Sequence, residues 1–317
     1  MSGAHRECRP ESVRAMRNIH QELTEKVIHA IETGQATGQS WTKPWHSAAA
    51  SGLPTNHATC TGYRGLNVLQ LWFAAVEKGF EHGLWLTYKQ AQAIGAQVRG
   101  GETGTQVIKF GQYQRADATT GETKTGAYLK TYSVFNVAQC DGITLPKVER
   151  PNLAERVERA EASLHGVGVP IYFGSDNAFY RPSTDTVHMP NPDAFRPVGD
   201  ATATEMFYAV GFHEIGHATG HEHRLNRNLK ARFGDATYAA EELIAELCSV
   251  FVMAELGLAH EPKQNANDYL AHWLGILRAD SKALMTAAAK TSAAATFIMK
   301  HECENSRTDA RAAALAA

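Results

Sequence analysis

The chain has 317 residues, of which 44% are hydrophobic and 20% charged, so it is long enough for two domains with apolar cores. This composition excludes extensive disorder and a collagen-like fold. The formal net charge of -2 hides an asymmetry, because residues 1–150 carry 16 Lys and Arg against 12 Asp and Glu, whereas residues 151–317 carry 15 against 21. A mildly basic N-terminal half suits binding to a polyanion.

Neither a membrane span nor a secretory signal is expected. No apolar run approaches about 18 residues, and Glu7 and Glu11 stand where a signal would need an apolar stretch. We therefore expect a cytoplasmic protein with no membrane partner. The five cysteines are odd in number, lie far apart and never form a CxxC pair, which argues against a disulfide framework and against a thiolate zinc cluster.

The N-terminal half predicts an α+β domain over residues 1–145. Apolar residues at spacings of three or four indicate a first amphipathic helix that Gly34 would end, and the Gly-, Ser- and Thr-rich segment after it indicates a loop. The predicted elements are helices over residues 11–33 and 67–78, a helix capped by Thr87, and strands over residues 105–113 and 128–137 that form a hairpin.

The C-terminal half predicts a second α+β domain over residues 156–305, after a linker at residues 146–155 that contains Pro and a run of charges. Residues 306–317 have little to bury, and we expect a flexible tail there. The predicted elements are a helix over residues 152–164, strands over 171–173, 178–181 and 186–189, helices over 202–219 and 238–256, and a helical tract over 265–300 that forms one helix or two.

His213, Glu214 and His217 form an HExxH string in a segment predicted to be helical. Residues four apart share a helix face, so both imidazoles can bind one divalent metal. Glu214 would face the open coordination position and act as the general base for a water molecule. The alternative is a solvent-facing helix with two unpaired histidines, which the apolar segment at residues 207–212 disfavours because it would bury the helix.

His223 is one candidate for the third metal ligand. The string continues through Gly220 to His223 and so matches the longer HExxHxxGxxH pattern. That class of site also needs a downstream turn containing Met, whereas Met253 lies within a helical pattern.

Glu242 is the competing candidate, and we favour it. Glu242 and Glu246 share a face of the predicted helix over residues 238–256, so Glu246 could hold a histidine N–H while Glu242 ligates. This arrangement resembles the glutamate helix of gluzincins. Glu241 is about 100 degrees around the helix, and we expect it at the surface. Two His and one carboxylate accept Zn, with Mn or Co as alternatives.

Longer segments around these motifs resemble the zincin-like domain of ArdC-type antirestriction proteins and of related plasmid primase-associated proteins. The segments that carry the resemblance are FHEIGHATGHEHRLNR at residues 212–227 and YAAEELIAE at residues 238–246. In the N-terminal half, YRGLNVLQLW at residues 63–72, WLTYKQA at 85–91 and SVFNVAQ at 133–139 resemble the single-stranded DNA-binding domain of the same family. The resemblance covers residues 21–301, and in this family the position of His223 is not regularly histidine, which favours Glu242.

The resemblance implies a protein of conjugative plasmids that binds single-stranded DNA and protects it from host restriction. It also implies a zinc-dependent metallopeptidase site, with a host restriction component as a candidate protein substrate. Two alternatives remain at this point: a gluzincin-like peptidase without a DNA role, and a single-stranded DNA-binding protein whose metal site is not catalytic.

Sequence-independent binding of single strands needs a positive groove and aromatic side chains on which bases stack, each stacked base contributing roughly 1 to 3 kcal/mol. Trp72 and Trp85 lie in apolar runs and are predicted to be core residues. Among the basic residues, Arg64, beside Tyr63, is the one that we most expect to contact DNA. The candidate DNA contacts are Trp41, Lys43, Trp45, Tyr63, Arg64, Lys89, Arg99, Lys109, Lys130 and Tyr132.

Overall fold

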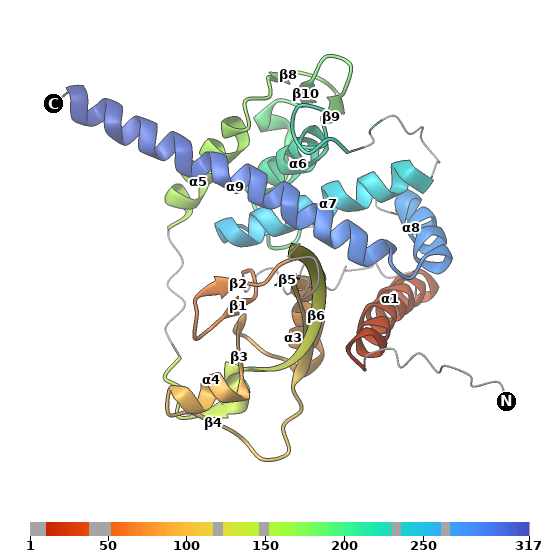
Figure 1. The fold of residues 1–317 in the computed structure, drawn as a ribbon. Coiled ribbons are helices and arrows are strands. Elements are labelled where there is room, and N and C mark those ends of the chain that lie inside the picture. Colours follow the sequence, from red (N-terminus) through yellow and green to blue (C-terminus); the bar gives the residue numbers. More distant parts are fainter. Residues whose placement is uncertain are drawn as a thin grey trace.

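The computed structural model describes residues 11–37, 52–116, 123–145, 152–227, 229, 236–260 and 267–316. Two α+β domains follow each other along the chain, and the helices of the second lie against the sheet and helices of the first (Figure 1). Trp41, Lys43 and Trp45, three of the predicted DNA contacts, lie outside the described residues.

A five-stranded sheet with the order β2-β1-β3-β6-β5 forms the centre of the first domain. The hairpin of β5 and β6 confirms the two predicted strands and is longer than expected, with twelve paired positions. Strands β1 to β3 were not predicted, because β1 and β2 have two residues each and lie in the segment interpreted as a loop, and β3 shows no alternation. The strands are β1 (Thr55–Asn56), β2 (Thr61–Gly62), β3 (Leu84–Thr87), β5 (Thr105–Ala116) and β6 (Thr123–Asn136).

Helices α1 (Glu11–Thr37), α3 (Leu66–Lys78) and α4 (Tyr88–Ala93) complete this domain, together with the small sheet of β4 (Gln97–Val98) and β7 (Cys140–Asp141) and a 3-10 turn at Val137–Gln139. Thr87 caps α4 as predicted, in a reciprocal arrangement with Gln90. Helix α1 continues three residues beyond Gly34, so this glycine does not end it. The predicted apolar stripe of α1 is buried at Ile19, Leu23, Val27 and Ile31.

The second domain contains a three-stranded sheet and five helices, each of which overlaps a segment predicted from the sequence. The sheet has the order β8-β10-β9, with β8 (Ile171–Phe173), β9 (Phe179–Arg181) and β10 (Thr186–Met189). The helices are α5 (Leu153–Gly166), α6 (Ala203–Ala218), α7 (Ala236–Leu256), α8 (Asn267–Ala279) and α9 (Ala283–Ala316). A short 3-10 turn at Pro192–Ala194 precedes α6.

Helix α5 confirms the helix predicted over residues 152–164, and the Asn152 side chain caps it by accepting a hydrogen bond from the Glu155 N–H. The C-terminal end differs from the sequence prediction. Helix α9 continues to Ala316 through the segment predicted as a flexible tail. That segment is rich in Ala, the residue with the highest intrinsic helix propensity.

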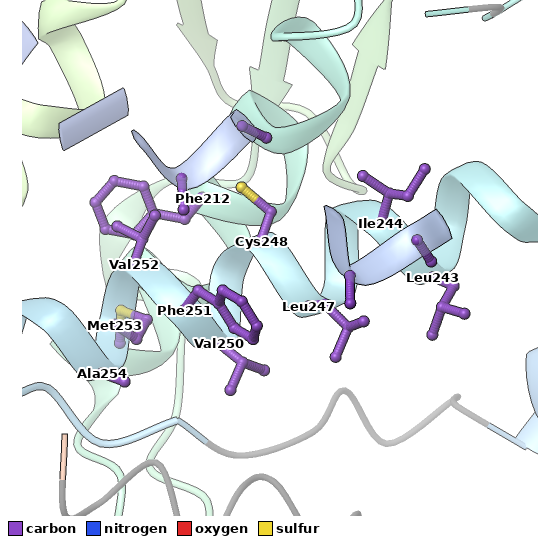
Figure 2. Close-up of a cluster of buried hydrophobic side chains, with 14 of the residues drawn as sticks. Phe212, Leu243, Ile244, Leu247, Cys248, Val250, Phe251, Val252, Met253 and Ala254 are labelled. Atoms are coloured by element: carbon purple, nitrogen blue, oxygen red, sulfur yellow. The ribbon is translucent and has the colours of Figure 1, made fainter. Parts of the chain in front are cut away.

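Helix α7 lies at the centre of the apolar core and contacts α5, α6, α8 and α9. Figure 2 shows apolar side chains of this helix between Leu243 and Ala254, with Phe212 of α6 beside them. Apolar residues on several sides are typical of a helix that is buried all round. No face of α7 between residues 241 and 254 is therefore available to solvent.

The core is continuous between the two domains. Trp72 of α3 packs edge to face on Phe251 of α7, with ring centroids 5.4 Å apart, and Trp85 is fully buried, so both tryptophans are core residues as predicted. Thr24 Oγ1 of α1 donates to the Ser281 carbonyl at 3.2 Å, and the Gly65 N–H donates to Ser292 Oγ of α9 at 2.6 Å. Among the described residues, no helix is long and apolar enough to cross a membrane.

Candidate metal centre

A close approach of α6 and α7 builds the candidate metal centre. Thr202 caps α6 with Glu205 in a reciprocal capping box, and the helix then runs through the HExxH string. A Cβ atom at Gly216 would lie 3.2 Å from the Ala245 Cα and 3.3 Å from the Cys248 Cβ. Only glycine lets the two backbones come this close without displacement, and this approach brings the two histidines to the carboxylates of α7.

His213, His217 and Glu242 converge at this contact. Their ligand atoms lie within 4.8 Å of one another, so among the described residues these three side chains form a cluster of potential metal ligands. His213 Nε2 is 3.4 Å from one oxygen of Glu242, and His217 Nε2 is 3.4 Å from the other. Ligand atoms held at 2.0 to 2.1 Å by a tetrahedral metal are about 3.4 Å apart, so this donor set fits a divalent ion.

His213 also carries a polar atom that fits this interpretation. Its Nδ1 is buried, has no hydrogen-bond partner among the described residues, and lies 3.7 Å from an oxygen of Glu246. A histidine that binds a metal through one ring nitrogen usually donates the other N–H to a carboxylate or carbonyl. Glu246 therefore lies on the outer side of His213, where a carboxylate could hold this N–H.

The surface position predicted for Glu241 is wrong. Glu241 is only 8% exposed, and its Oε1 lies 3.6 Å from Nδ1 of His217. Each histidine thus has its own outer carboxylate, Glu246 for His213 and Glu241 for His217. The prediction failed because it assumed a solvent-facing side of α7, whereas this helix is covered all round.

Arg227 fixes Glu241 in place. Its guanidinium donates to both oxygens of Glu241, at 2.6 Å and 3.0 Å, and also to the Gly216 carbonyl and to Thr219 Oγ1. One side chain from the loop after α6 therefore joins the end of α6 to the beginning of α7. No sequence pattern singled out Arg227, because the contact depends on how the loop returns toward α7.

The electrostatics of the group follow from these contacts. Burial opposes charge on His217, but the carboxylates of Glu241 and Glu242 overcome it and raise its pKa to about 10. Burial also opposes ionisation of Glu242, but His213 and His217 hold the pKa of this carboxyl well below its usual range. The group therefore combines an ionised carboxylate with an imidazole whose proton a metal would have to displace.

His223, the competing third ligand, lies in the turn after α6 with 77% of its side chain exposed, and its Nε2 is 3.6 Å from Glu222. It does not belong to the cluster of His213, His217 and Glu242. Glu214 is 4% exposed and adds to the negative field that raises the pKa of His217. The buried carboxylate of Glu214 therefore lies in the electrostatic environment of the two histidines.

The described DNA-contact candidates fall into separate groups. Lys109 and Lys130 face each other across β5 and β6, and Tyr132 lies two residues further on the same side of β6. Tyr128, which the sequence analysis missed, belongs to this group, with Lys130 Nζ 5.3 Å from the centre of its ring. The sequence contained a signal for this residue, because Tyr128, Lys130 and Tyr132 alternate along β6 and so point to the same face of the sheet.

The other candidates lie elsewhere on the first domain. Tyr63 is partly buried, and its hydroxyl accepts a hydrogen bond from Asn56. Arg64 follows it and is exposed. Lys89 is exposed on α4, whereas Arg99 pairs with Glu102 and Asp141. These two carboxylates offset the charge of Arg99, which reduces its value as a phosphate contact.

Comparisons with known proteins agree with this architecture. Residues 17–135 match the family described as the N-terminal domain of anti-restriction factor ArdC, and residues 158–290 match a zincin-like metallopeptidase family. A metal-free crystal structure of the antirestriction protein ArdC from plasmid R388 superposes with a TM-score of 0.70 at 34% identity, covering 90% of this chain and 98% of that chain. The chain belongs to the ArdC-type antirestriction family.

Further matches also extend over most of this chain. A Mn(II)-bound crystal structure of R388 ArdC gives a TM-score of 0.68. An uncharacterized protein, y4eC of Sinorhizobium fredii, is 41% identical over 94% of this chain and 96% of its own length. The DNA primase TraC of Escherichia coli is 38% identical over 90% of this chain, but the match spans only 27% of the primase.

We expect Arg227→Met to lower the free energy of unfolding by about 3–5 kcal/mol, because it leaves the Glu241 carboxylate buried without its partner. Chemical denaturation of the metal-free protein measures this loss. Adding Glu241→Gln to the variant removes the stranded charge and should restore part of the stability. If the single variant is as stable as the wild type, this ion pair does not hold the loop to α7.

Proposed function

We propose that this protein is an antirestriction factor that binds single-stranded DNA and carries a metal-dependent peptidase site. The observation that carries the peptidase part is the convergence of His213, His217 and Glu242 within 4.8 Å, with Glu214 on the same helix. Membership of the ArdC-type family supports the antirestriction role. The basic and aromatic residues of the first domain support the DNA part.

The donor set of the site assigns a role to each side chain. His213, His217 and Glu242 would hold the ion, with zinc favoured by the two imidazoles and manganese supported by the Mn(II)-bound form of the R388 relative. When bound, the ion would supply Lewis-acid activation of a water molecule and of a peptide carbonyl. Glu246 and Glu241 would orient the two imidazoles through their outer nitrogens.

Glu214 would carry the proton transfers of peptide hydrolysis. Its carboxylate would take a proton from the attacking water and deliver it to the amine that leaves, which completes the cleavage of the amide bond. The burial of Glu214 limits competing water around this step. A host restriction component is the protein substrate that fits an antirestriction role.

The metal ligands can be tested by substitution. His213→Ala or His217→Ala should abolish stoichiometric metal binding, and Glu242→Ala should weaken it strongly, because each removes a donor atom from the cluster. His223→Ala is the matched control, and it should retain the metal because this side chain is exposed outside the cluster. Elemental analysis of the purified proteins measures metal content, and loss of metal from His223→Ala with retention in Glu242→Ala would reverse the ligand assignment.

Glu214→Gln tests the peptidase mechanism separately from metal binding. The variant should keep its metal and its DNA affinity but lose peptidase activity by about 100- to 10,000-fold, which is the usual contribution of general acid–base catalysis. Cleavage is measured on a protein that the wild type cuts. Glu222→Gln, an exposed residue outside the cluster, is the control. Undiminished cleavage by Glu214→Gln would refute this mechanism and leave a binding protein with a metal site.

Single-stranded DNA binding should weaken steeply with salt, because bound lysines and arginines release counterions from the phosphates. The full chain is the appropriate sample, since the core continues from one domain into the other. Arg64→Ala should weaken binding to all sequences alike and reduce the salt slope by about 1. Arg196→Ala, an exposed arginine of the second domain, is the control.

Fluorescence anisotropy with labelled oligonucleotides at two salt concentrations measures these effects. Equal or tighter binding to duplex DNA would contradict the proposal, because paired bases do not offer their faces for stacking.

A further inference from the structure

A cavity of about 610 Å³ opens between the two domains. The start of α3 and strand β5 line it from the first domain, whereas α9 and the loop after α6 line it from the second. Asn67 occupies backbone hydrogen-bonding groups of the edge strand β5 here, because its side chain donates to the Ile108 carbonyl and accepts from the Ile108 N–H, both at 2.8 Å. The volume lies within the range of about 300–1,000 Å³ that is usual for ligand pockets.

The charged side chains that line this cavity are both basic. Arg64 contributes from the first domain and Lys300 from α9, and among the described residues no Asp or Glu lines the cavity. Arg64 is exposed and makes no ion pair with any residue that the structure describes. This charge is complementary to an anion such as a phosphate group.

An exposed aromatic ring stands in the same cavity. Phe110 of β5 is 64% exposed, more than any other large hydrophobic side chain among the described residues, and Phe297 lines the cavity from α9. Phe110 lies on the face of β5 opposite to that of Lys109 and Lys130, since successive side chains of a strand alternate. The remaining lining is mostly apolar or small, which suits the flat face of a base.

A second cavity, of about 330 Å³, meets the first at Arg64 and Lys300. Glu255 lines this second cavity, which makes it a poorer place for a phosphate. Arg64 and Lys300 line both cavities, so the first cavity, which Glu255 does not line, is the better place for a phosphate.

We propose that the cavity between the domains binds a nucleotide of single-stranded DNA, with its base against Phe110 and its phosphate at Arg64 and Lys300. This assignment rests on the proposed DNA binding and adds a contribution from α9 of the peptidase-like domain. A base in a duplex could not enter, because both of its faces are stacked and its edge is paired. The loop that carries Arg227 reaches the same cavity through Leu225.

Anisotropy of labelled oligothymidylate with the full-length protein tests the assignment. Phe110→Ala should raise Kd by about 5- to 150-fold, the equivalent of one lost stacking contact, without changing the salt slope. Phe110→Trp should restore binding, since it returns an aromatic face. Ala293→Trp, at an exposed residue of α9 that lines the cavity, should weaken binding by filling the space. Tyr172→Ala removes an exposed aromatic residue outside the cavity and should bind as the wild type does.

The outcomes separate this assignment from the proposed function. If the wild type binds oligothymidylate and both Phe110→Ala and Ala293→Trp bind equally well, the cavity is not the nucleotide site, although DNA binding stands. If the wild type does not bind, the proposed DNA function fails and the assignment fails with it. Metal content and melting temperature equal to those of the wild type establish that each variant is folded.

Discussion

The close contact between α6 and α7 at Gly216 is the constraint on which the candidate metal centre depends. A Cβ atom at this position would meet the backbone of Ala245 at 3.2 Å, so even alanine would require the two helices to shift by a few tenths of an ångström. Separation of the helices would withdraw Glu242 from the two histidines, and a metal site with ligands on two helices tolerates little such movement. The burial of α7 on all sides gives this contact its rigidity, because α8 and α9 press on the helix from other directions.

The same burial explains the arrangement of charges around the site. Buried carboxylates are costly unless each has a partner, and Glu241, Glu242 and Glu246 all lie within a few ångströms of a histidine nitrogen. Arg227 offsets the charge of Glu241 and at the same time ties the loop after α6 to α7. Arg224 holds the earlier part of this loop, through an ion pair with Asp185 and a hydrogen bond to the Ala218 carbonyl.

The two domains share one continuous apolar core. Trp72 packs on Phe251, so a side chain of the first domain touches the helix that carries Glu242. The proposed nucleotide cavity lies on this junction, with Arg64 on one side and Lys300 on the other. Leu225, in the loop that positions Arg227, lines that cavity as well. The proposed DNA site and the candidate metal centre would therefore lie in neighbouring parts of one continuous core.

The sequence by itself determined most of the helices, the β5–β6 hairpin, the strands of the second domain, the two-domain organisation and the candidate HExxH pair, because each depends on the pattern along one segment. His213 and His217 share a helix face whatever surrounds them, and the ExxxE spacing singled out Glu242 in the same way. Only the tertiary structure decided the place of Glu241, the contact of Arg227 and the cavity at Phe110. These features depend on which faces neighbouring elements cover, and periodicity within one helix or strand does not contain that information.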